Sequence, residues 1–302
     1  MLAEPNQCDI CASALRPLYP RVRDPQTGET FSINQCVSCG LGHTSPHLVD
    51  LARYYGPQYH GGRYGFTEQL AVSRRVRFVR AVARPQTILD FGCGDGAFLA
   101  AAAELGWRVT GVEVHPWHAR ERGLIVTERI EEAVGPFDVV TLWHSLEHVR
   151  SPRELMQAIT ARLNADGTVL VAVPNLDGIQ ARTFKQHWFH LDVPRHLFHF
   201  TPTALTRLLK SSGLRVVRRW NLESEQDLFG WTQGFLNRIV PHSNVLFDVL
   251  TARGDSHKRW EAVASLVLGG GITVVSAPIV PLAAVLSKGA VMIFAAKLSQ
   301  SA

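Results

Sequence analysis

Four of the five cysteines lie in two closely spaced pairs near the start of the 302-residue chain. Cys8 and Cys11 form one C-x-x-C pair, Cys36 and Cys39 form a second, and 24 residues separate the pairs. Zinc takes four thiolates in a tetrahedral site at such spacings, and four thiolates leave no open position for catalysis. The pattern predicts a structural zinc ribbon over residues 1–50, and a redox-active thiol pair is the weaker alternative.

A loop rich in glycine and carboxylates follows a short apolar run at Thr87–Phe91. It reads Asp90-Phe91-Gly92-Cys93-Gly94-Asp95-Gly96 and opens a helical pattern over Ala97–Leu105. Glycines allow the backbone to approach a ligand where a strand ends. The loop fits either a dinucleotide or S-adenosylmethionine.

Two carboxylates bear on the choice of cofactor. Asp95 would repel a pyrophosphate, whereas S-adenosylmethionine carries an ammonium and a sulfonium that tolerate acidic surroundings. Glu113 ends the next strand-like run, where a carboxylate can accept hydrogen bonds from ribose hydroxyls of either cofactor. The residues therefore favour S-adenosylmethionine.

The elements that position these residues alternate between strand and helix. The strand-like runs are Thr87–Phe91, Val109–Val114, Phe137–Trp143, Thr168–Val173, Leu214–Trp220 and Ala290–Lys297. Alternation of this kind predicts an α/β fold with a doubly wound, mostly parallel sheet. We expect three segments: the ribbon at 1–50, a connector with a basic helix at 51–84, and the α/β domain at 85–302.

An insert at about 222–288 differs in character from the rest of the α/β domain. Within it, Ala262–Ser287 is a run of 26 residues without a charge, broken by Gly269-Gly270-Gly271, Pro278 and Pro281. The run is long enough to cross a bilayer, but its glycines and prolines argue against one straight helix. Three interpretations stay open: a shallow hairpin on the inner membrane leaflet, a hydrophobic cap over a lipid-tailed acceptor, and a buried helix pair, which is favoured.

Several stretches resemble class I S-adenosylmethionine-dependent methyltransferases. DFGCGDG matches their D-x-G-x-G-x-G loop, and GVEV supplies the acidic residue after the second strand. GCGDGAFL, LWHSLEHV, VPNLDG, HWFHLDVPRHLFHFTP and KGAVMIFAAK resemble one bacterial methyltransferase family more narrowly. The resemblance covers most of the chain and implies a seven-stranded Rossmann-like sheet with S-adenosylmethionine as cofactor.

The resemblance also implies roles for individual residues. It places Asp90, Gly92 and Gly94, with Cys93 and Gly96 in the same loop, at the methionine end of the cofactor. It places Glu113 at the ribose, and Trp143 and His144 at the floor of the pocket. Glu128 is a candidate for the adenine amino group.

The acceptor must approach the cofactor beyond the strand Phe137–Trp143, where His144 and His148 follow with Glu147 between them. A hydroxyl acceptor has to lose a proton, and a neutral histidine is the usual base. We assign His148 as the first candidate for base and His144 as the second; the equal alternative is that His148 orients the loop. The stretch also resembles the E-x-x-E-H segment of ubiquinone-type O-methyltransferases, which can bind a divalent metal, but His144 replaces the first acid.

A histidine-rich segment, His187–His199, contains two H-x-x-H pairs. We favour a packed lid over a metal cluster, with His190 and His196 satisfying backbone groups or lining the acceptor pocket. Arg195 is assigned to an anionic group of the acceptor.

Composition limits the acceptor only loosely. The formal charge of +5 and pI near 9.1 favour acidic partners without deciding among them. We expect a methyltransferase for a small-molecule, glycan or lipid-linked acceptor; the alternative is an RNA methyltransferase that uses the ribbon and the helix bearing Arg74, Arg75, Arg77 and Arg80.

The N-terminus shows no signal-peptide pattern, so we expect a cytoplasmic protein, with membrane contact through 262–287 as a further option. The acceptor and oligomeric state do not follow from the sequence.

Overall fold

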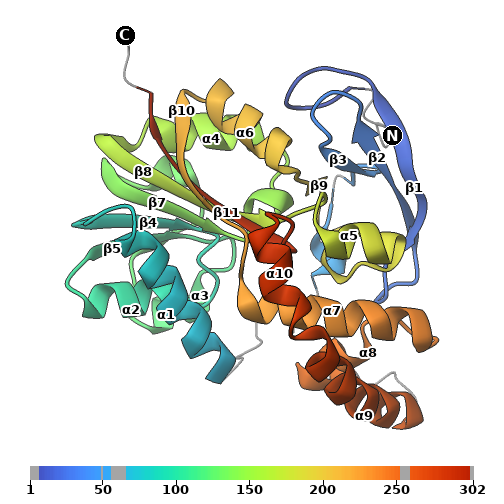
Figure 1. Ribbon diagram of the computed structural model, residues 1–302. Helices are drawn as coiled ribbons and strands as arrows, with labels where there is room; N and C mark the ends of the chain where they lie inside the picture. The colour runs from blue at the N-terminus through green and yellow to red at the C-terminus, as the bar shows by residue number, and fades with distance from the viewer. Residues whose placement is uncertain (1–6, 49, 56–65, 252–258, 300–302) are drawn as a thin grey trace. The chain divides into compact units, whose positions relative to one another are not determined.

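A computed structural model describes residues 7–48, 50–55, 66–251 and 259–299 (Figure 1). The chain divides into two compact units. The cysteine unit comprises Met1–Arg63, Pro174–Ala204 and Trp220–Met292, and the sheet unit comprises Tyr64–Val173, Leu205–Arg219 and Ile293–Ala302. The connector residues Tyr59 to Tyr64 lie outside the described ranges, and the predicted segment boundaries stay a prediction.

The sheet unit is built on a seven-stranded sheet in the order β10-β11-β8-β7-β4-β5-β6. Its strands are β4 (Thr87–Phe91), β5 (Arg108–Val112), β6 (Val126–Thr127), β7 (Phe137–Trp143), β8 (Leu163–Pro174), β10 (Leu214–Trp220) and β11 (Val291–Leu298). Strands β6, β5, β4, β7 and β8 pair in parallel. The predicted doubly wound fold is confirmed.

Helices cover both faces of this sheet in Figure 1, with α4 and α6 on one side and α1, α2 and α3 on the other. Their bounds are α1 (Phe66–Arg80), α2 (Ala97–Glu104), α3 (Trp117–Glu121), α4 (Pro152–Thr160) and α6 (Pro202–Ser211). Ser151 caps α4, because its side chain accepts a hydrogen bond from the Glu154 amide. Strands covered on both faces must be apolar throughout, and β7 accordingly reads FDVVTLW with six of its seven residues buried.

The cysteine unit contains a second sheet, in the order β1-β2-β3-β9. Its strands are β1 (Leu15–Arg23), β2 (Thr30–Cys36), β3 (Gly42–Ser45) and β9 (Phe198–His199). β9 pairs antiparallel with β3, so His43 lies opposite Phe198 although the two are far apart in sequence. The sequence did not reveal this pairing, because β9 is only two residues long.

Helices complete the cysteine unit, namely α5 (Ile179–Phe184), α7 (Ser224–Ile239), α8 (Val245–Leu250), α9 (Arg259–Ser276) and α10 (Ile279–Val285). Short 3-10 turns lie at Ala52–Tyr54, Lys185–His187 and Phe189–Leu191. An apolar core joins strands and helices through Phe31, Ile33, Tyr54, Phe184, Trp188 and Trp231. The histidine-rich segment therefore supplies core residues to this unit, as the packed-lid interpretation expected of Trp188.

The uncharged run forms the consecutive helices α9 and α10, which are bent by 46° relative to each other. Among the described residues, neither helix alone is long and apolar enough to cross a membrane, although the bent pair passes that test by length and composition. The favoured interpretation as a buried helix pair is wrong. Val267, Val275 and Val285 are 71%, 75% and 82% exposed, because these helices turn only one side toward the unit.

Candidate functional site

The loop after β4 begins with a buried carboxylate. Asp90 is 2% exposed, and its Oδ1 accepts a hydrogen bond of 2.6 Å from the Thr141 hydroxyl on the adjacent strand β7. Burial raises the pKa of Asp90 to about 7, with the charge of Glu113 adding to the rise, whereas the Thr141 hydrogen bond and the Arg75 charge oppose it. A carboxylate in this environment gains stability from a cationic ligand.

Three glycines shape the rest of the loop. Gly92, Gly94 and Gly96 have φ angles of 72°, 57° and 79°, a region that side chains other than glycine rarely adopt. A Cβ on Gly92 would lie 2.7 Å from the Cβ of Ser145, whereas a Cβ on Gly94 would meet no atom within 4 Å. Gly92 thus allows two loops to pack, and Gly94 borders open space where a ligand can approach the backbone.

Glu113 holds the glycine loop in place. Its Oε2 accepts a hydrogen bond of 2.9 Å from the Gly94 amide, and its Oε1 accepts one of 3.1 Å from the His115 amide. Each carboxylate oxygen can accept a further hydrogen bond. The carboxylate therefore stands between the ends of β4 and β5 with capacity left for a pair of hydroxyls.

Trp143, at the end of β7, is 5% exposed and packs under two helices. Its ring lies 6.3 Å from Phe78 of α1 and 5.8 Å from Phe98 of α2, and the Arg75 guanidinium lies 5.4 Å over it. Within the described residues its Nε1 is buried without a hydrogen-bond partner. Such an orphaned donor is uncommon in a folded protein and fits a site that a ligand completes.

The loop after β7 carries both candidate bases. His144 has a positive φ of 55°, and its Nδ1 lies 3.6 Å from Oε1 of the buried Glu147. His148 ends a 3-10 turn over Leu146–His148, is half-buried, and donates its amide to the Ser145 carbonyl at 3.2 Å. Ser145 in turn donates its hydroxyl to the Phe91 carbonyl at 2.7 Å, which ties this loop to the glycine loop.

Two other residues of the glycine loop have different surroundings. Cys93 is buried, and burial raises the pKa of its thiol, so it packs as an inert side chain. The Asp95 carboxylate pairs with Arg122 at 2.6 Å and accepts from the Ala97 amide. Arg122 therefore neutralises the charge of Asp95. Repulsion between Asp95 and a pyrophosphate, which the sequence suggested, is then no longer an argument against a dinucleotide.

Glu128 follows the edge strand β6, which pairs with β5, the strand that directly precedes Glu113. Its side chain is 59% exposed and lies 3.6 Å from Arg120. The role of Glu128 toward adenine stays a prediction.

The residues predicted to bind the acceptor belong to the cysteine unit and serve its packing. Arg195 is 1% exposed, and its guanidinium lies 2.9 Å from Asp24 and 2.7 Å from Asp192. His196 Nδ1 lies 3.0 Å from the His190 carbonyl, and the imidazoles of both residues are buried. The assignment of Arg195 to an anionic acceptor is wrong, because two carboxylates of the chain already neutralise it.

The four cysteines of the two C-x-x-C pairs converge, with sulfur atoms within 4.8 Å of one another. The Cys8 and Cys39 sulfurs are 3.5 Å apart, as are those of Cys11 and Cys36. A tetrahedral zinc with Zn–S bonds of about 2.3 Å would hold its sulfurs about 3.8 Å apart. The amides of Ser38 and Cys39 also point to the Cys36 sulfur at 3.4 Å. The cluster fits a zinc ion.

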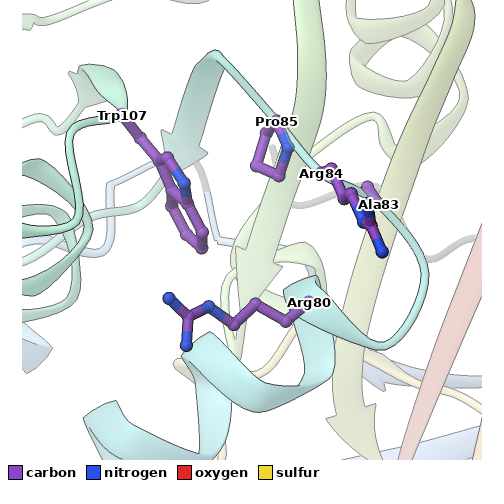
Figure 2. Close-up of a pocket in the computed structure, with 5 residues that line it drawn as sticks. All are labelled: Arg80, Ala83, Arg84, Pro85 and Trp107. Atoms are coloured by element: carbon purple, nitrogen blue, oxygen red, sulfur yellow. The ribbon is translucent and has the colours of Figure 1, made fainter.

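A separate pocket of about 290 Å³ lies beside the end of α1, lined by Arg80, Ala83, Arg84, Pro85 and Trp107 (Figure 2). Figure 2 shows the guanidinium of Arg80 directed toward the indole of Trp107 across the pocket. The glycine loop contributes no residue to this lining, so the pocket is distinct from the site formed by Asp90 and Glu113.

Sequence reasoning did not assign Arg75, Thr141 or Ser145 to the site. Thr141 sits in the middle of an apolar strand, where a hydroxyl needs a partner, and this was a signal for a buried acceptor on a neighbouring strand. Ser145 and Arg75 offered no such signal, because serine after a strand and arginine on a helix are both common.

Comparison with known proteins supports the fold and the family. The family model described as "Methyltransferase domain" matches residues 65–219. The ubiquinone biosynthesis O-methyltransferase of Caulobacter vibrioides is 33% identical over 129 residues, which are 37% of this chain and 51% of that protein. That of Idiomarina loihiensis is 29% identical over 147 residues, 42% of this chain and 60% of that protein. The chain thus spans about half the length of these relatives.

A solved structure shares the fold. The mycolic acid cyclopropane synthase complexed with SAH and CTAB superimposes with a TM-score of 0.51 and 16% identity, covering 80% of this chain and 90% of that chain. The similarity confirms the Rossmann-like methyltransferase fold.

Proposed function

The chain belongs to the methyltransferase-domain family, and from this premise we propose that it transfers the methyl group of S-adenosylmethionine to a hydroxyl group of a small-molecule acceptor. One observation carries the proposal. The Glu113 carboxylate bridges the amide of Gly94 and that of His115 at the end of β5, beside the open face of Gly94 and the buried Asp90.

The two carboxylates suit the two polar ends of this cofactor. Asp90 has a raised pKa and would be stabilised as an anion by the ammonium of the methionine end. Glu113 would accept hydrogen bonds from the ribose hydroxyls while it keeps its backbone donors. When bound, the cofactor supplies a methyl group on a sulfonium that is already a good leaving group.

The remaining chemistry concerns the acceptor's proton. His148 would accept this proton, with the loop that bears it fixed by the hydrogen bond from Ser145 to Phe91. Trp143 and the overlying Arg75 would exclude water from the side of the site beneath α1. The O-methyltransferase relatives support a hydroxyl acceptor, and the glycan and lipid-linked classes are finer forms of the same proposal.

A structural zinc at the four cysteines is the second part of the proposal. The convergence of the sulfurs and the amide contacts to Cys36 support it. All four ligands would be thiolates, so the ion would stabilise the cysteine unit and take no part in methyl transfer.

The RNA alternative gains no specific support. One of the four arginines of its proposed basic helix, Arg75, lies over the Trp143 ring, and its charge acts on the buried Asp90. Phosphate binding by this helix would therefore have to rely on the other arginines.

The test is incubation with S-adenosylmethionine labelled in its methyl group and cell extract fractionated into small-molecule, lipid, glycan and RNA pools. We expect label in a non-RNA pool with the wild type, and at least about tenfold less with Glu113→Ala, which removes charged hydrogen bonds to the cofactor. Label in RNA would overturn the acceptor class. Equal labelling by both proteins would overturn the site.

A further inference from the structure

Helix α9 has its polarity reversed relative to a helix of a water-soluble protein. Its outward side carries large apolar residues, with Val263, Val267 and Val274 exposed by 60%, 71% and 74%. The exposed apolar set on α9 and α10 is Trp260, Val263, Leu266, Val267, Leu268, Val274, Val275, Leu282, Val285 and Leu286. We call this set the apolar face. Ten large apolar side chains exposed on two consecutive helices mark an interaction site.

The inward side of α9 is mostly small or polar. Glu261, Ser265, Gly269 and Ser276 are its buried residues, one or two helical turns apart, and the half-buried Ile272 packs beside them against α7 and α8. The Thr273 hydroxyl lies 2.7 Å from that of Thr232 on α7, and Glu261 lies 2.9 Å from the His242 imidazole.

Small and polar residues between helices, with apolar residues outside, are typical of helices that face lipid. The hydrophobic effect in water would produce the opposite arrangement. The polarity of α9 therefore indicates that its outer side does not face water in the working protein.

We infer that the apolar face of α9 and α10 docks on a lipid bilayer with an anionic surface. The occupant is lipid and not a protein, because Ala262–Ser287 continues through both helices without one charged residue while the buried side of α9 is mostly small or polar. The inference does not depend on which acceptor the enzyme methylates.

The geometry of the helices favours a position in the plane of the membrane. Helix α9 has 18 residues, a length of about 27 Å, but α10 has seven residues and is bent by 46° from it. The chain enters α9 after α8, which packs against α7, and returns to β11 of the seven-stranded sheet. Both ends of the hairpin therefore lead back into folded protein, so the pair lies on the surface without crossing it.

Charge supports an anionic surface. Arg259 opens α9 and is exposed, and the chain carries a formal charge of +5. The run Ala262–Ser287 contains no acidic residue that would oppose contact with anionic headgroups. The one acid of α9, Glu261, lies before this run and is buried against His242.

Flotation with vesicles tests the inference. The full chain is mixed with anionic vesicles of phosphatidylcholine and phosphatidylglycerol, at a ratio of about 3:1, or with vesicles of phosphatidylcholine alone. We compare the wild type, the double variant Val267→Asp/Val275→Asp, and Val134→Asp, whose valine is 88% exposed in the sheet unit. Circular dichroism and affinity for S-adenosylmethionine establish that each variant is folded.

We expect the wild type and Val134→Asp to float with the anionic vesicles, and the double variant to bind at least about tenfold more weakly, since two buried charges oppose insertion. Binding to phosphatidylcholine alone should be weaker. Failure of the wild type to float, or equal flotation of the double variant, would overturn the inference. A vesicle-independent dimer that the double variant abolishes, seen by light scattering, would instead make a second copy the occupant.

Discussion

The guanidinium of Arg195 lies 2.9 Å from the carboxylate of Asp24, and both side chains are buried. Asp24 lies in the turn between β1 and β2, and Arg195 lies just before β9. The pair therefore joins two segments of the cysteine unit that are 171 residues apart in sequence. Its role is to fix the ribbon strands to the histidine-rich segment.

Breaking this pair should destabilise the protein. Asp24→Ala removes one of the two carboxylates that neutralise the buried guanidinium, so we expect the free energy of unfolding to fall by about 3 kcal/mol. The control is Glu131→Ala, which removes an exposed pair with Arg129 and should change the free energy of unfolding far less, because water screens both charges. Urea denaturation measures both. Equal small losses would show that the buried pair contributes no more than a surface contact.

Zinc content tests the cysteine cluster. Protein purified without chelator should contain one zinc per chain, because the four sulfurs form a closed site. Cys36→Ser should lose the metal, whereas Cys93→Ser, which changes the buried cysteine of the glycine loop, should keep it. Elemental analysis by mass spectrometry gives the ratio. A zinc-free wild type, or retention of zinc by Cys36→Ser, would refute the site.

The raised pKa of Asp90, about 7, predicts a pH dependence of stability. The native carboxyl holds its proton more tightly than the unfolded one, so this contribution is complete below pH 3.8 and is lost as pH rises through 7. The free energy of unfolding of the ligand-free protein should therefore fall over this range. Asp90→Asn should remove that part of the slope in urea titrations at several pH values, and an unchanged slope would refute the assignment.

The same carboxyl links cofactor binding to pH. The ammonium of S-adenosylmethionine favours the ionised form, so affinity should rise about tenfold from about pH 5.5 to 7 as the Asp90 proton is released. Calorimetry in buffers of different ionisation enthalpy detects that proton. Asp90→Asn is the control and should show neither the rise nor the proton release.

Local patterns along the chain were sufficient to predict much of the fold. The strands Thr87–Phe91, Phe137–Trp143 and Leu214–Trp220 have the predicted bounds. The first two are largely apolar runs, the third is rich in valine and arginine, and each is followed by glycine or a polar residue. The cysteine cluster and the position of Glu113 followed from spacing in the same way. These features depend on residues close together in sequence.

Long-range pairing could not be predicted. The two-residue strand β9 leaves no periodic signal, and its pairing with β3 depends on tertiary packing. Arg195 looked like an anion-binding residue because nothing in its neighbourhood shows that Asp24 reaches it. The buried helix pair was favoured over an exposed apolar surface for a related reason: a run of uncharged residues does not show which side of a helix faces the rest of the unit.

His148 is the proposed base, and its removal should affect turnover more than binding. His148→Ala should lower the rate of methyl transfer by about 100- to 10,000-fold at neutral pH, with cofactor affinity nearly unchanged. The comparison is between the methyl-transfer rates of the wild type and the variant from about pH 6 to 9, measured with labelled S-adenosylmethionine and the extract pool that accepts the label. Wild-type turnover across that range would move the base elsewhere, with His144 as the next candidate.

The most direct test of the account is the affinity for S-adenosylmethionine of the wild type, Glu113→Ala and the matched control Glu128→Ala, measured by titration calorimetry. Glu113 bridges two loop amides at the centre of the proposed site, whereas Glu128 is exposed and pairs with Arg120. We predict binding by the wild type, a loss of about 1 to 3 kcal/mol in Glu113→Ala, and a smaller loss in Glu128→Ala. Unchanged affinity in Glu113→Ala, or tighter binding of NAD than of S-adenosylmethionine by the wild type, would contradict the central claim.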